Sequence, residues 1–455
     1  MISELDTEDM DSNVRTLNGR FRSALILENP HPSLDDELRS QGIEVERLPE
    51  SKTKDRDYVL ARLREGQHDL LFKRSRFRVD REVLRASRKL AAVMLCCIGD
   101  DSVDKQACAE EGVLVLNDPV SNGRSVAEMV IGEMICLARR IFIAHEAGRE
   151  HLWTKASSGR YELLGRTISV IGLGNIGRQV ARLAESFGIK VTFYDQSSVA
   201  REVGRAFGWS ECRSLEEAFR TGDVVTLHLS AEDPQGRRNE DIIGLDHFRL
   251  LGADCGERTP RVFINAARGF LYDPEALRTA LEEGAVRAAA VDVFPEEPGS
   301  KEDEWRNPYA DVSAVATTPH IGAATEEAQP RIARHVAQSA ELLNLRGTVR
   351  DTVFRPKLSL ALDAEPGQWA LAVIHSDARG TKKAMADAIF EAGANNIDST
   401  HHDFPRYGIA YEISAIDRPL EEPQIEQLID GARQISGDPQ AIRSVRQFQI
   451  GGKNP

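Results

Sequence analysis

The stretch RTISVIGLGNIGRQVARLAESFGIKVTFYD, residues 166–195, decides the fold of the central part of this chain. A β-branched strand, a glycine-rich turn and an amphipathic helix follow one another, and a second strand then ends at Asp195. Gly172 turns the chain, Gly174 lets the backbone approach a pyrophosphate, and Gly177 lets the helix pack on the strand. We therefore expect a dinucleotide-binding half, although a glycine-bearing turn in a doubly wound sheet has the same spacing.

The acid at the end of the second strand indicates which dinucleotide binds. An acid about 20 residues after the first glycine accepts hydrogen bonds from the ribose hydroxyls of NAD and repels the additional phosphate of NADP. Asp195 occupies this place, and the residues after it are QSS rather than an arginine. The sequence therefore predicts NAD as the cofactor.

Length and composition limit the class of protein. The chain has 455 residues, more than one hydrophobic core supports, so two or three domains are expected. Its 72 acidic and 58 basic side chains give a net charge of −14, which argues against nucleic acid or an anionic membrane as partner. A local basic pocket for a small anionic substrate remains compatible with that charge.

The six cysteines and the first residues indicate the compartment. The cysteines show no C-x-x-C pair and no metal-ligand spacing, which predicts reduced thiols and no metal site. The start, MISELDTEDMDSN, is acidic and polar, and the sequence contains no long apolar run. We expect a cytoplasmic protein.

Apolar runs alternate with helical patterns along the chain. SALILE, HDLLFK and LAAVMLCCIG precede a long helical pattern from Asn122, and DVVTLHL, RVFINAA, AAAVDVF and AVATTP follow the glycine-rich turn. Near-continuous apolar strands suit parallel sheets covered on both faces. The fold expected is α/β, with two doubly wound parallel-sheet (Rossmann-like) domains. From Gln368 the order β-α-β-β-α-β predicts a C-terminal ferredoxin-like α+β domain.

Three polar residues follow three strand ends, where such sheets bind ligands. They are Arg268 in NAARG, Glu297 in DVFPEEP and His320 in TTPHIG. A lone histidine among small residues is more often packed than catalytic. If Glu297 and His320 meet, the carboxylate fixes the imidazole tautomer and raises its pKa.

These motifs together resemble a known family. GLGNIG with Asp195, INAARG, VDVFPEEP and TTPHIGAATEEAQ, with KRSRF, CCIGDDSVD and LNDPVSNGRSVAEMVIGE upstream, are similar to the NAD-dependent D-2-hydroxyacid dehydrogenases. The resemblance runs from about Ser23 to Arg346. It is strongest to members that oxidise 3-phospho-D-glycerate, or 3-phosphoglycerate, to 3-phosphohydroxypyruvate in L-serine biosynthesis, and it implies that small anionic substrate.

The resemblance also implies the role of each site residue. His320 would be the base, Glu297 its orienting partner and Arg268 the cation that binds the substrate carboxylate. Asp292 would contact the cofactor, although a strand-end carboxylate can also serve only as a cap. The cofactor contacts implied are Gly172, Gly174, Asn175, Ile176, Gly177, Asp195, Ala266, Ala267, Asp292, Ile321, Gly322 and Ala323, and the substrate contacts are Arg74, Ser75, Arg76, Gly99, Asn122 and Lys155. The run FKRSRFR, with Lys73 and Arg78, would otherwise be interpreted as a solvated basic face.

The domain organisation implied is discontinuous. Residues 22–127 and 323–345 would form the substrate-binding domain, 128–322 the NAD-binding domain, 346–367 a linker and 368–455 an ACT-like regulatory or oligomerisation domain. The segment with Trp153 and Lys155 suggests a dimer through the nucleotide domains, and the ACT-like domains a tetramer. Two other functions stay open: oxidation of another 2-hydroxy acid, such as glycerate or 2-hydroxyglutarate, and NAD sensing without catalysis.

Two departures from the family pattern affect function. The family's H-x-P after the fourth strand is His228-Leu229-Ser230 here, which removes a rigid turn near the cofactor. In the run HSDARG, Asp377 and Arg379 replace the Asn and Pro of the family's serine effector site. An ionised carboxylate accepts hydrogen bonds but does not donate them, so weak serine inhibition or none is expected.

Cofactor preference provides the first test. NAD should be preferred over NADP. Asp195→Ala should reduce the difference in kcat/KM between the two cofactors, because the carboxylate that repels the additional phosphate is gone. Steady-state kcat/KM with each cofactor measures the preference. Comparable values for NAD and NADP in the parent protein would contradict the prediction.

Overall fold

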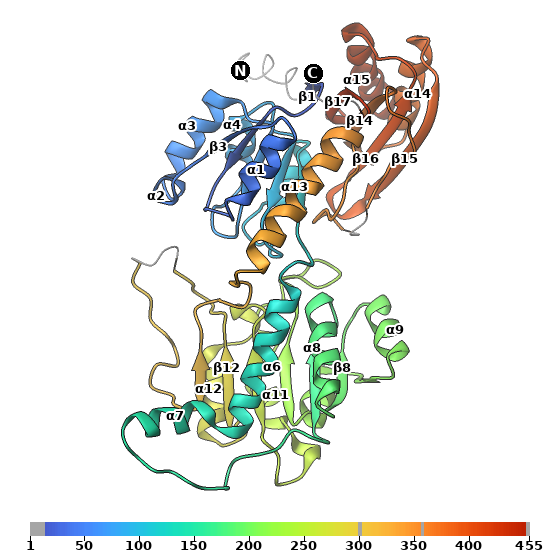
Figure 1. Cartoon of the computed structure of the whole chain (residues 1–455). Helices are drawn as coiled ribbons and strands as arrows, with labels where there is room; N and C mark the ends of the chain where they lie inside the picture. The colour runs from blue at the N-terminus through green and yellow to red at the C-terminus, as the bar shows by residue number, and fades with distance from the viewer. Residues whose placement is uncertain (1–13, 299–302, 356–358, 452–455) are drawn as a thin grey trace, which may run out of the picture. The chain divides into compact units, whose positions relative to one another are not determined.

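The computed structural model describes residues 14–298, 303–355 and 359–451 (Figure 1). The chain forms two compact units: the first comprises Met1–Pro119 with Pro330–Pro455, and the second is Val120–Gln329. The expected domain segments at 299–302, 356–358 and 452–455, and the acidic start at 1–13, lie outside the described residues.

The second unit is built on a seven-stranded parallel sheet. Its strand order places the glycine-bearing strand beside the point where the chain order reverses, which is where doubly wound sheets bind dinucleotides. In spatial order the strands are β13 (Val315–Thr317), β12 (Ala288–Val291), β11 (Val262–Asn265), β10 (Val224–Leu227), β7 (Thr167–Ile171), β8 (Lys190–Tyr194) and β9 (Ser210–Glu211).

Apolar cores cover both faces of this sheet. Ile264 of β11 packs in one core with α6 and α8, and the preceding residue, Phe263, packs in the other core with Phe219 and Phe248. Strands buried on both faces explain the continuous apolar runs of the sequence. Figure 1 shows α6 and α8 along the same side of the sheet. The helices of this unit are α6 (Gly123–Arg139), α7 (Ile141–Arg149), α8 (Asn175–Ser186), α9 (Ser198–Ala206), α10 (Leu215–Thr221), α11 (Leu245–Leu250) and α12 (Pro274–Glu282).

The long helical pattern from Asn122 is not one helix. Arg140 has a left-handed backbone, with φ 55°, and separates α6 from α7. The prediction of a continuous helix was therefore wrong at this residue. The apolar spacing of the sequence continues across Arg140, so it did not reveal the break.

The first unit contains a five-stranded parallel sheet of doubly wound order. Asp55, Asp80 and Asp104 begin three of its helices, and each carboxylate accepts a hydrogen bond from a backbone N–H in the first turn. The strands in spatial order are β3 (Glu44–Arg47), β2 (Ser23–Ile26), β4 (Leu70–Lys73), β5 (Ala92–Leu95) and β6 (Leu114–Asn117), and the helices are α1 (Ser33–Ser40), α2 (Glu50–Thr53), α3 (Arg56–Gly66), α4 (Arg81–Ala86), α5 (Lys105–Glu110) and α13 (Ala328–Arg346).

The remainder of the first unit has the ferredoxin-like order that the sequence predicts. Its four strands form an antiparallel sheet, and two helices pack on one face. The elements are β14 (Trp369–Ser376), α14 (Thr381–Glu391), β15 (Asn396–Phe404), β16 (Ile409–Ile416), α15 (Glu422–Ser436) and β17 (Ile442–Gln449).

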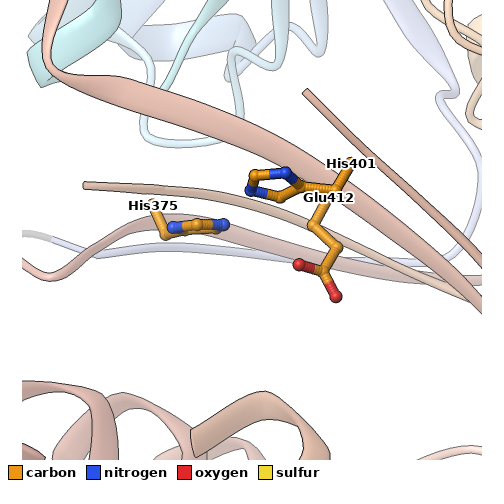
Figure 2. A group of neighbouring side chains, drawn as sticks. All are labelled: His375, His401 and Glu412. Atoms are coloured by element: carbon orange, nitrogen blue, oxygen red, sulfur yellow. The ribbon is translucent and has the colours of Figure 1, made fainter. Parts of the chain in front are cut away.

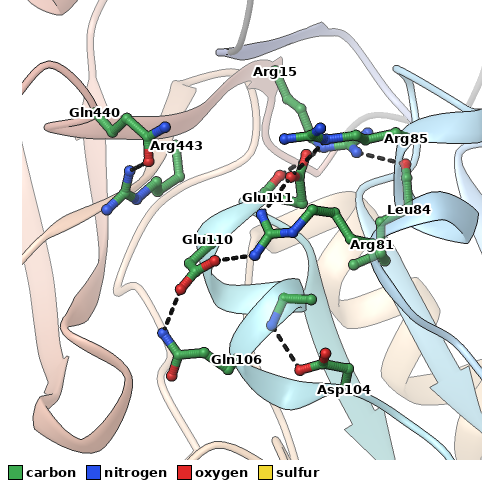
Figure 3. Close-up of polar contacts among 11 residues, drawn as sticks. Arg15, Arg81, Leu84, Arg85, Asp104, Gln106, Glu110, Glu111, Gln440 and Arg443 are labelled. Carbon is green, nitrogen blue, oxygen red and sulfur yellow. Dashed lines mark hydrogen bonds and ion pairs between the residues drawn. The ribbon is translucent and has the colours of Figure 1, made fainter.

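A fifth strand joins this sheet from the other end of the chain. β1 (Arg15–Asn18) pairs in parallel with β17, and the apolar runs of the sequence, which begin at SALILE, did not predict this strand. Arg15 of β1 is buried and donates hydrogen bonds to the carbonyls of Leu84, Ser87 and Glu111. Figure 3 shows Arg15 beside Leu84 and Glu111. β1 depends on the backbone pairing with β17 and on the hydrogen bonds of the buried Arg15 guanidinium. No local pattern in RTLN indicates either of these contacts.

Arg446 of β17 is a second buried cation in the first unit. Its guanidinium donates to the carbonyls of Leu343 and Asn344, at 2.8 and 3.0 Å. It also lies over the rings of Phe21 and Phe448, 3.7 and 4.1 Å from their centroids. These contacts connect the end of α13, the start of the parallel-sheet region and the ferredoxin-like sheet.

None of the helices in the described residues combines the length and apolar character required to cross a bilayer.

Replacement of Arg446 tests this connection. Arg446→Ala should lower the unfolding midpoint of the first unit by roughly 5–10 °C, because several buried carbonyls lose their donor. Differential scanning calorimetry measures the change. Arg418→Ala, at a side chain that is 61% exposed, is the matched control and should shift the midpoint little. Equal midpoints for the two variants would contradict the prediction.

Candidate active site

His320 and Glu297 meet in the second unit. The Nδ1 atom of His320 lies 2.7 Å from a carboxylate oxygen of Glu297. Glu297 follows β12 and His320 follows β13, two neighbouring strands of the parallel sheet. The carboxyl ends of such strands lie at one edge, which brings together residues that are distant in sequence.

The pair changes the ionisation of both groups. The hydrogen bond that His320 donates to Glu297, and then the charge of Glu297, raise the pKa of His320, while burial lowers it. Burial alone would raise the pKa of Glu297, but the hydrogen bond and the charge of His320 lower it overall. The ring therefore stays protonated to higher pH than an isolated histidine.

The loop that carries His320 is organised by Asp292. This buried carboxylate accepts hydrogen bonds from the Thr318 hydroxyl at 2.6 Å and from the N–H groups of Ile321 and Gly322 at 2.8 and 2.9 Å. Burial, and then the charge of Asp292, raise the pKa of nearby Glu133 to about 8, so that side chain is neutral at pH 7. These bonds are those of a carboxylate that caps the loop after the strand, which was the alternative interpretation of Asp292 from the sequence. A cofactor contact by Asp292 stays a prediction.

Arg268 lies near the pair, in the turn after β11. Its positive charge lowers the pKa of both Glu297 and His320. Asn265 holds the turn, because its side chain donates to the carbonyl of Arg268 at 2.9 Å and accepts from the N–H of Ala267 at 3.0 Å. A cation, a carboxylate and an imidazole at one sheet edge can bind a carboxylate-bearing substrate and exchange a proton with it.

Gly269 fixes how closely this turn approaches the next strand end. A Cβ at Gly269 would lie 1.9 Å from the carbonyl carbon of Phe294, so only glycine fits. The N–H of Phe294 in turn donates to Glu297 at 3.1 Å. The positions of Arg268 and Glu297 therefore depend on the same backbone contact, and sequence reasoning did not identify Asn265 or Gly269.

The glycine-rich turn fits the dinucleotide that the sequence predicts. A Cβ at Gly177 would lie 2.1 Å from the carbonyl oxygen of Gly172, and Gly172 itself has φ 93°. A Cβ at Gly174, in contrast, would meet no described atom within 4 Å, which leaves space for a pyrophosphate beside the first turn of α8. Asp195, at the end of β8, accepts hydrogen bonds from the N–H groups of Leu173 and Ser197, both at 2.7 Å.

The segment that departs from H-x-P is ordered by other contacts. His228 is partly buried, its Nε2 lies 3.0 Å from the Thr226 hydroxyl, and burial lowers its pKa to about 3. Ser230, in the place of the proline, donates its hydroxyl to the carbonyl of Glu232. A side-chain hydrogen bond thus shapes the turn that proline would have constrained.

In the first unit, the loop after β4 is held by a residue that sequence reasoning missed. The carboxylate of Glu28 accepts hydrogen bonds from the N–H groups of Arg74, Arg76 and Phe77, and Glu28 is only 4% exposed. Lys73 is buried and donates to Ser102, so it does not belong to the exposed basic cluster with which the sequence grouped it. Glu28 follows β2, the strand that pairs with β4.

The other predicted site residues lie at loops and helix starts, each within its own unit. Asn122 precedes α6 and is buried, and its amide oxygen has no hydrogen-bond partner among the described residues. Lys155 is exposed in the segment after α7. Gly99 follows β5, Asn175 and Ile176 begin α8, Ala266 and Ala267 follow β11, Ile321, Gly322 and Ala323 follow His320, and Ser75 is exposed between Arg74 and Arg76.

Comparison with known proteins agrees with this geometry. Residues 131–322 match the family model described as D-isomer specific 2-hydroxyacid dehydrogenase, NAD binding domain. The D-3-phosphoglycerate dehydrogenase of Haemophilus influenzae is 34% identical over 79% of this chain and 83% of its own length. The chain belongs to this family of NAD-dependent dehydrogenases.

Two further comparisons extend the match for this dehydrogenase. The D-3-phosphoglycerate dehydrogenase of Escherichia coli (strain K12) is 35% identical over 71% of this chain and 74% of its own length. A solved structure of a glyoxylate reductase from Paecilomyes thermophila has a TM-score of 0.62 at 24% identity, covering 73% of this chain and 98% of its own. At that identity the structural match concerns the fold alone.

The His320–Glu297 pair predicts a pH shift. In Glu297→Gln the imidazolium loses its charged partner, so the pKa of His320 falls toward its ordinary value. Reduction of a 2-oxo acid needs the protonated ring, so its loss of rate with rising pH should occur at lower pH than in the parent. The measurement is kcat/KM for NADH-dependent reduction against pH.

Glu296→Gln is the matched control for this shift. Glu296 is the preceding residue and is exposed, so its neutralisation should leave the profile close to that of the parent. Identical profiles for the parent and Glu297→Gln would show that the pair does not act on the titrating group.

Proposed function

We propose that this dehydrogenase oxidises 3-phospho-D-glycerate to 3-phosphohydroxypyruvate, the first step of L-serine biosynthesis. The observation that carries the proposal is the His320–Glu297 hydrogen bond of 2.7 Å within the electrostatic reach of Arg268. The names of the Haemophilus influenzae and Escherichia coli relatives support the choice of substrate.

His320 is the proposed base. Its Nδ1 atom is engaged by Glu297, which leaves Nε2 to take the proton from the C2 hydroxyl of the substrate. NAD, when bound, accepts the hydride that leaves C2. In the reducing direction the imidazolium returns its proton to the same oxygen.

Arg268 is the proposed anchor of the reacting end of the substrate. A guanidinium presents several N–H donors in a fixed plane, which suits a carboxylate and the adjacent C2 oxygen. Asn265 and Gly269 hold the turn from which Arg268 extends. The positive charge of Arg268 also lowers the pKa of His320, in opposition to Glu297. The protonated imidazole therefore releases its proton more easily during turnover.

Asp292 is proposed to act in cofactor binding through the loop it holds. Its bonds to Ile321 and Gly322 fix the backbone for which a cofactor contact is proposed. The glycine-rich turn and Asp195 form the remaining part of that proposed site.

The loop of Arg74, Ser75 and Arg76 is the proposed recognition element for the substrate phosphate. Glu28 holds its backbone, while Ser75 and Arg76 are exposed. A phosphate needs positive charge and hydrogen-bond donors, and both arginines supply them. Gly99 and Asn122 are proposed to add backbone and amide contacts.

The proposed assembly is a homodimer through the nucleotide domains, extended to a tetramer through the ACT-like domains. Large apolar side chains gather in the segment around α7, where Trp153 is 92% exposed and Leu164 76%. Such exposure in one chain suits burial against a second copy. Lys155 lies in the same segment, and the proposal gives it a role at the partner's substrate site.

Free cysteines among the described residues support the cytoplasm as the compartment.

Replacement of Arg74 tests the substrate assignment. Arg74→Ala should lower kcat/KM for phosphohydroxypyruvate by about 10-fold or more, because one charged hydrogen bond to the phosphate is lost. The value for hydroxypyruvate, which lacks the phosphate, should change little. Steady-state NADH oxidation with both substrates measures the ratio.

Arg78→Ala is the matched control, since Arg78 lies in the same basic run and is exposed. It should preserve the ratio between the two substrates. If Arg74→Ala lowered kcat/KM equally for both substrates, this loop would not recognise the phosphate. That result would favour another 2-hydroxy acid as the substrate.

A further inference from the structure

Three potential metal ligands gather in the ferredoxin-like part of the first unit. His375 lies on β14, His401 on β15 and Glu412 on β16, three adjacent strands of one sheet. His401 is directly opposite Glu412, and Glu412 is opposite Val373, two residues before His375. Side chains two residues apart point to the same face, so all three share the face that carries α14 and α15.

The ligand atoms of the three side chains are close to one another. One atom from each residue can be chosen so that all lie within 4.8 Å, and Figure 2 shows the side chains gathered along one stretch of the sheet. In the part of the chain that the structure describes, this is the one group of histidine, cysteine and acidic residues with such spacing. The cluster belongs to the first unit, whereas Arg268, Glu297 and His320 belong to the second unit.

Each of the three residues has a buried polar atom that lacks a hydrogen-bond partner among the described residues. These atoms are Nε2 of His375, Nε2 of His401 and Oε2 of Glu412. His375 is 1% exposed and Glu412 is 8% exposed. An unpaired buried polar group costs about 1–3 kcal/mol, so three at one place indicate a missing partner.

The tautomer of His375 directs a lone pair to this place. Its Nδ1 atom lies 2.7 Å from the carbonyl oxygen of Ser376, and a carbonyl only accepts, so Nδ1 carries the proton. The Nε2 atom is then unprotonated and available as a ligand. Metal-binding histidines commonly donate their other ring N–H to a backbone carbonyl in this way.

Burial of the cluster favours the neutral form of its histidines. Burial lowers the pKa of His375 and of His401, and the nearby Lys382 acts in the same direction on both. Burial raises the pKa of Glu412, against the effect of Lys382. Neutral imidazoles bind metal ions, and a bound cation would stabilise the ionised carboxylate.

Other polar groups face His401 from its own strand and from the loop after β14. Asp403 has an oxygen 3.3 Å from Nε2 of His401, without the geometry of a hydrogen bond. Asp377 and Asp403 raise the pKa of His401, and His402 lowers it. Asp403 is therefore the alternative partner of this imidazole, and also a carboxylate near enough to join a coordination shell after rotation.

We propose that His375, His401 and Glu412 bind a divalent transition-metal ion, with Zn²⁺ as the ion that this ligand set fits best. Two imidazole nitrogens and one carboxylate oxygen are ligands that Zn²⁺ accepts. Three protein ligands leave a fourth position for water or for a small ligand. The residues are far apart in sequence and meet only through strand pairing, which is why spacing predicted no metal site.

Metal titration of the full chain tests the proposal. The untagged protein, stripped with a chelator, is titrated with Zn²⁺ by calorimetry and with Co²⁺ by visible absorption. One saturable site per chain is expected, with a Co²⁺ spectrum typical of four or five coordination. His401→Ala and Glu412→Gln should each weaken binding by at least about 10-fold, because each loses a direct ligand.

His402→Ala is the matched control, since this neighbouring histidine points to the opposite face of the same strand, against Phe404. It should bind Zn²⁺ like the parent. Glu412→Gln preserves shape, and circular dichroism of each variant separates ligand loss from unfolding. Zn²⁺ should also raise the thermal midpoint of the parent more than that of Glu412→Gln.

Two results would overturn the proposal. One is the absence of saturable Zn²⁺ and Co²⁺ binding by the parent at micromolar concentration. The other is binding that keeps the same affinity in His401→Ala and Glu412→Gln. If that binding disappears in His320→Ala, the ion lies at His320 instead.

Discussion

Asp292 lies buried at the end of β12, and its two carboxylate oxygens accept hydrogen bonds from Thr318, Ile321 and Gly322. A buried carboxylate without partners would be costly, so these bonds determine the path of the loop. That path gives His320 a left-handed backbone, with φ 53°, and brings its ring to Glu297. The position of the His320 ring therefore depends on a buried charge whose partners are backbone and loop groups.

The first unit uses the same principle with both signs of charge. Glu28 is buried and accepts three backbone hydrogen bonds from the loop after β4. Arg15 and Arg446 are buried and donate to backbone carbonyls of segments that are distant in the sequence. In each case one long-range side chain fixes a segment that its own sequence does not fix. Buried polar atoms of His375, His401 and Glu412 lack a hydrogen-bond partner among the described residues, and the proposed metal ion supplies one.

The sequence predicted what depends on local pattern and on strand ends. Apolar runs predicted the parallel strands. The strand ends left open whether Glu297 and His320 meet, the family resemblance implied that they do, and the structure places them 2.7 Å apart. The errors concern features that depend on distant partners. RTLN becomes β1 only because β17 offers an edge, and Arg140 interrupts a continuous apolar spacing. Lys73 is buried although Arg76 and Arg78 of the same basic run are exposed. Glu28 and the His375 cluster were missed for the same reason, since their partners lie on other strands.

Substrate choice connects the geometry of the catalytic pair with the basic loop and with the named relatives. The most direct measurement is kcat/KM of the parent protein for NADH-dependent reduction of phosphohydroxypyruvate, hydroxypyruvate, pyruvate and 2-oxoglutarate. The highest value is predicted for phosphohydroxypyruvate, because only this one of the four acids carries the phosphate that the loop of Arg74 and Arg76 is proposed to recognise. NADH binding without turnover of any of the four acids, or a higher value for an acid without phosphate, would contradict this account.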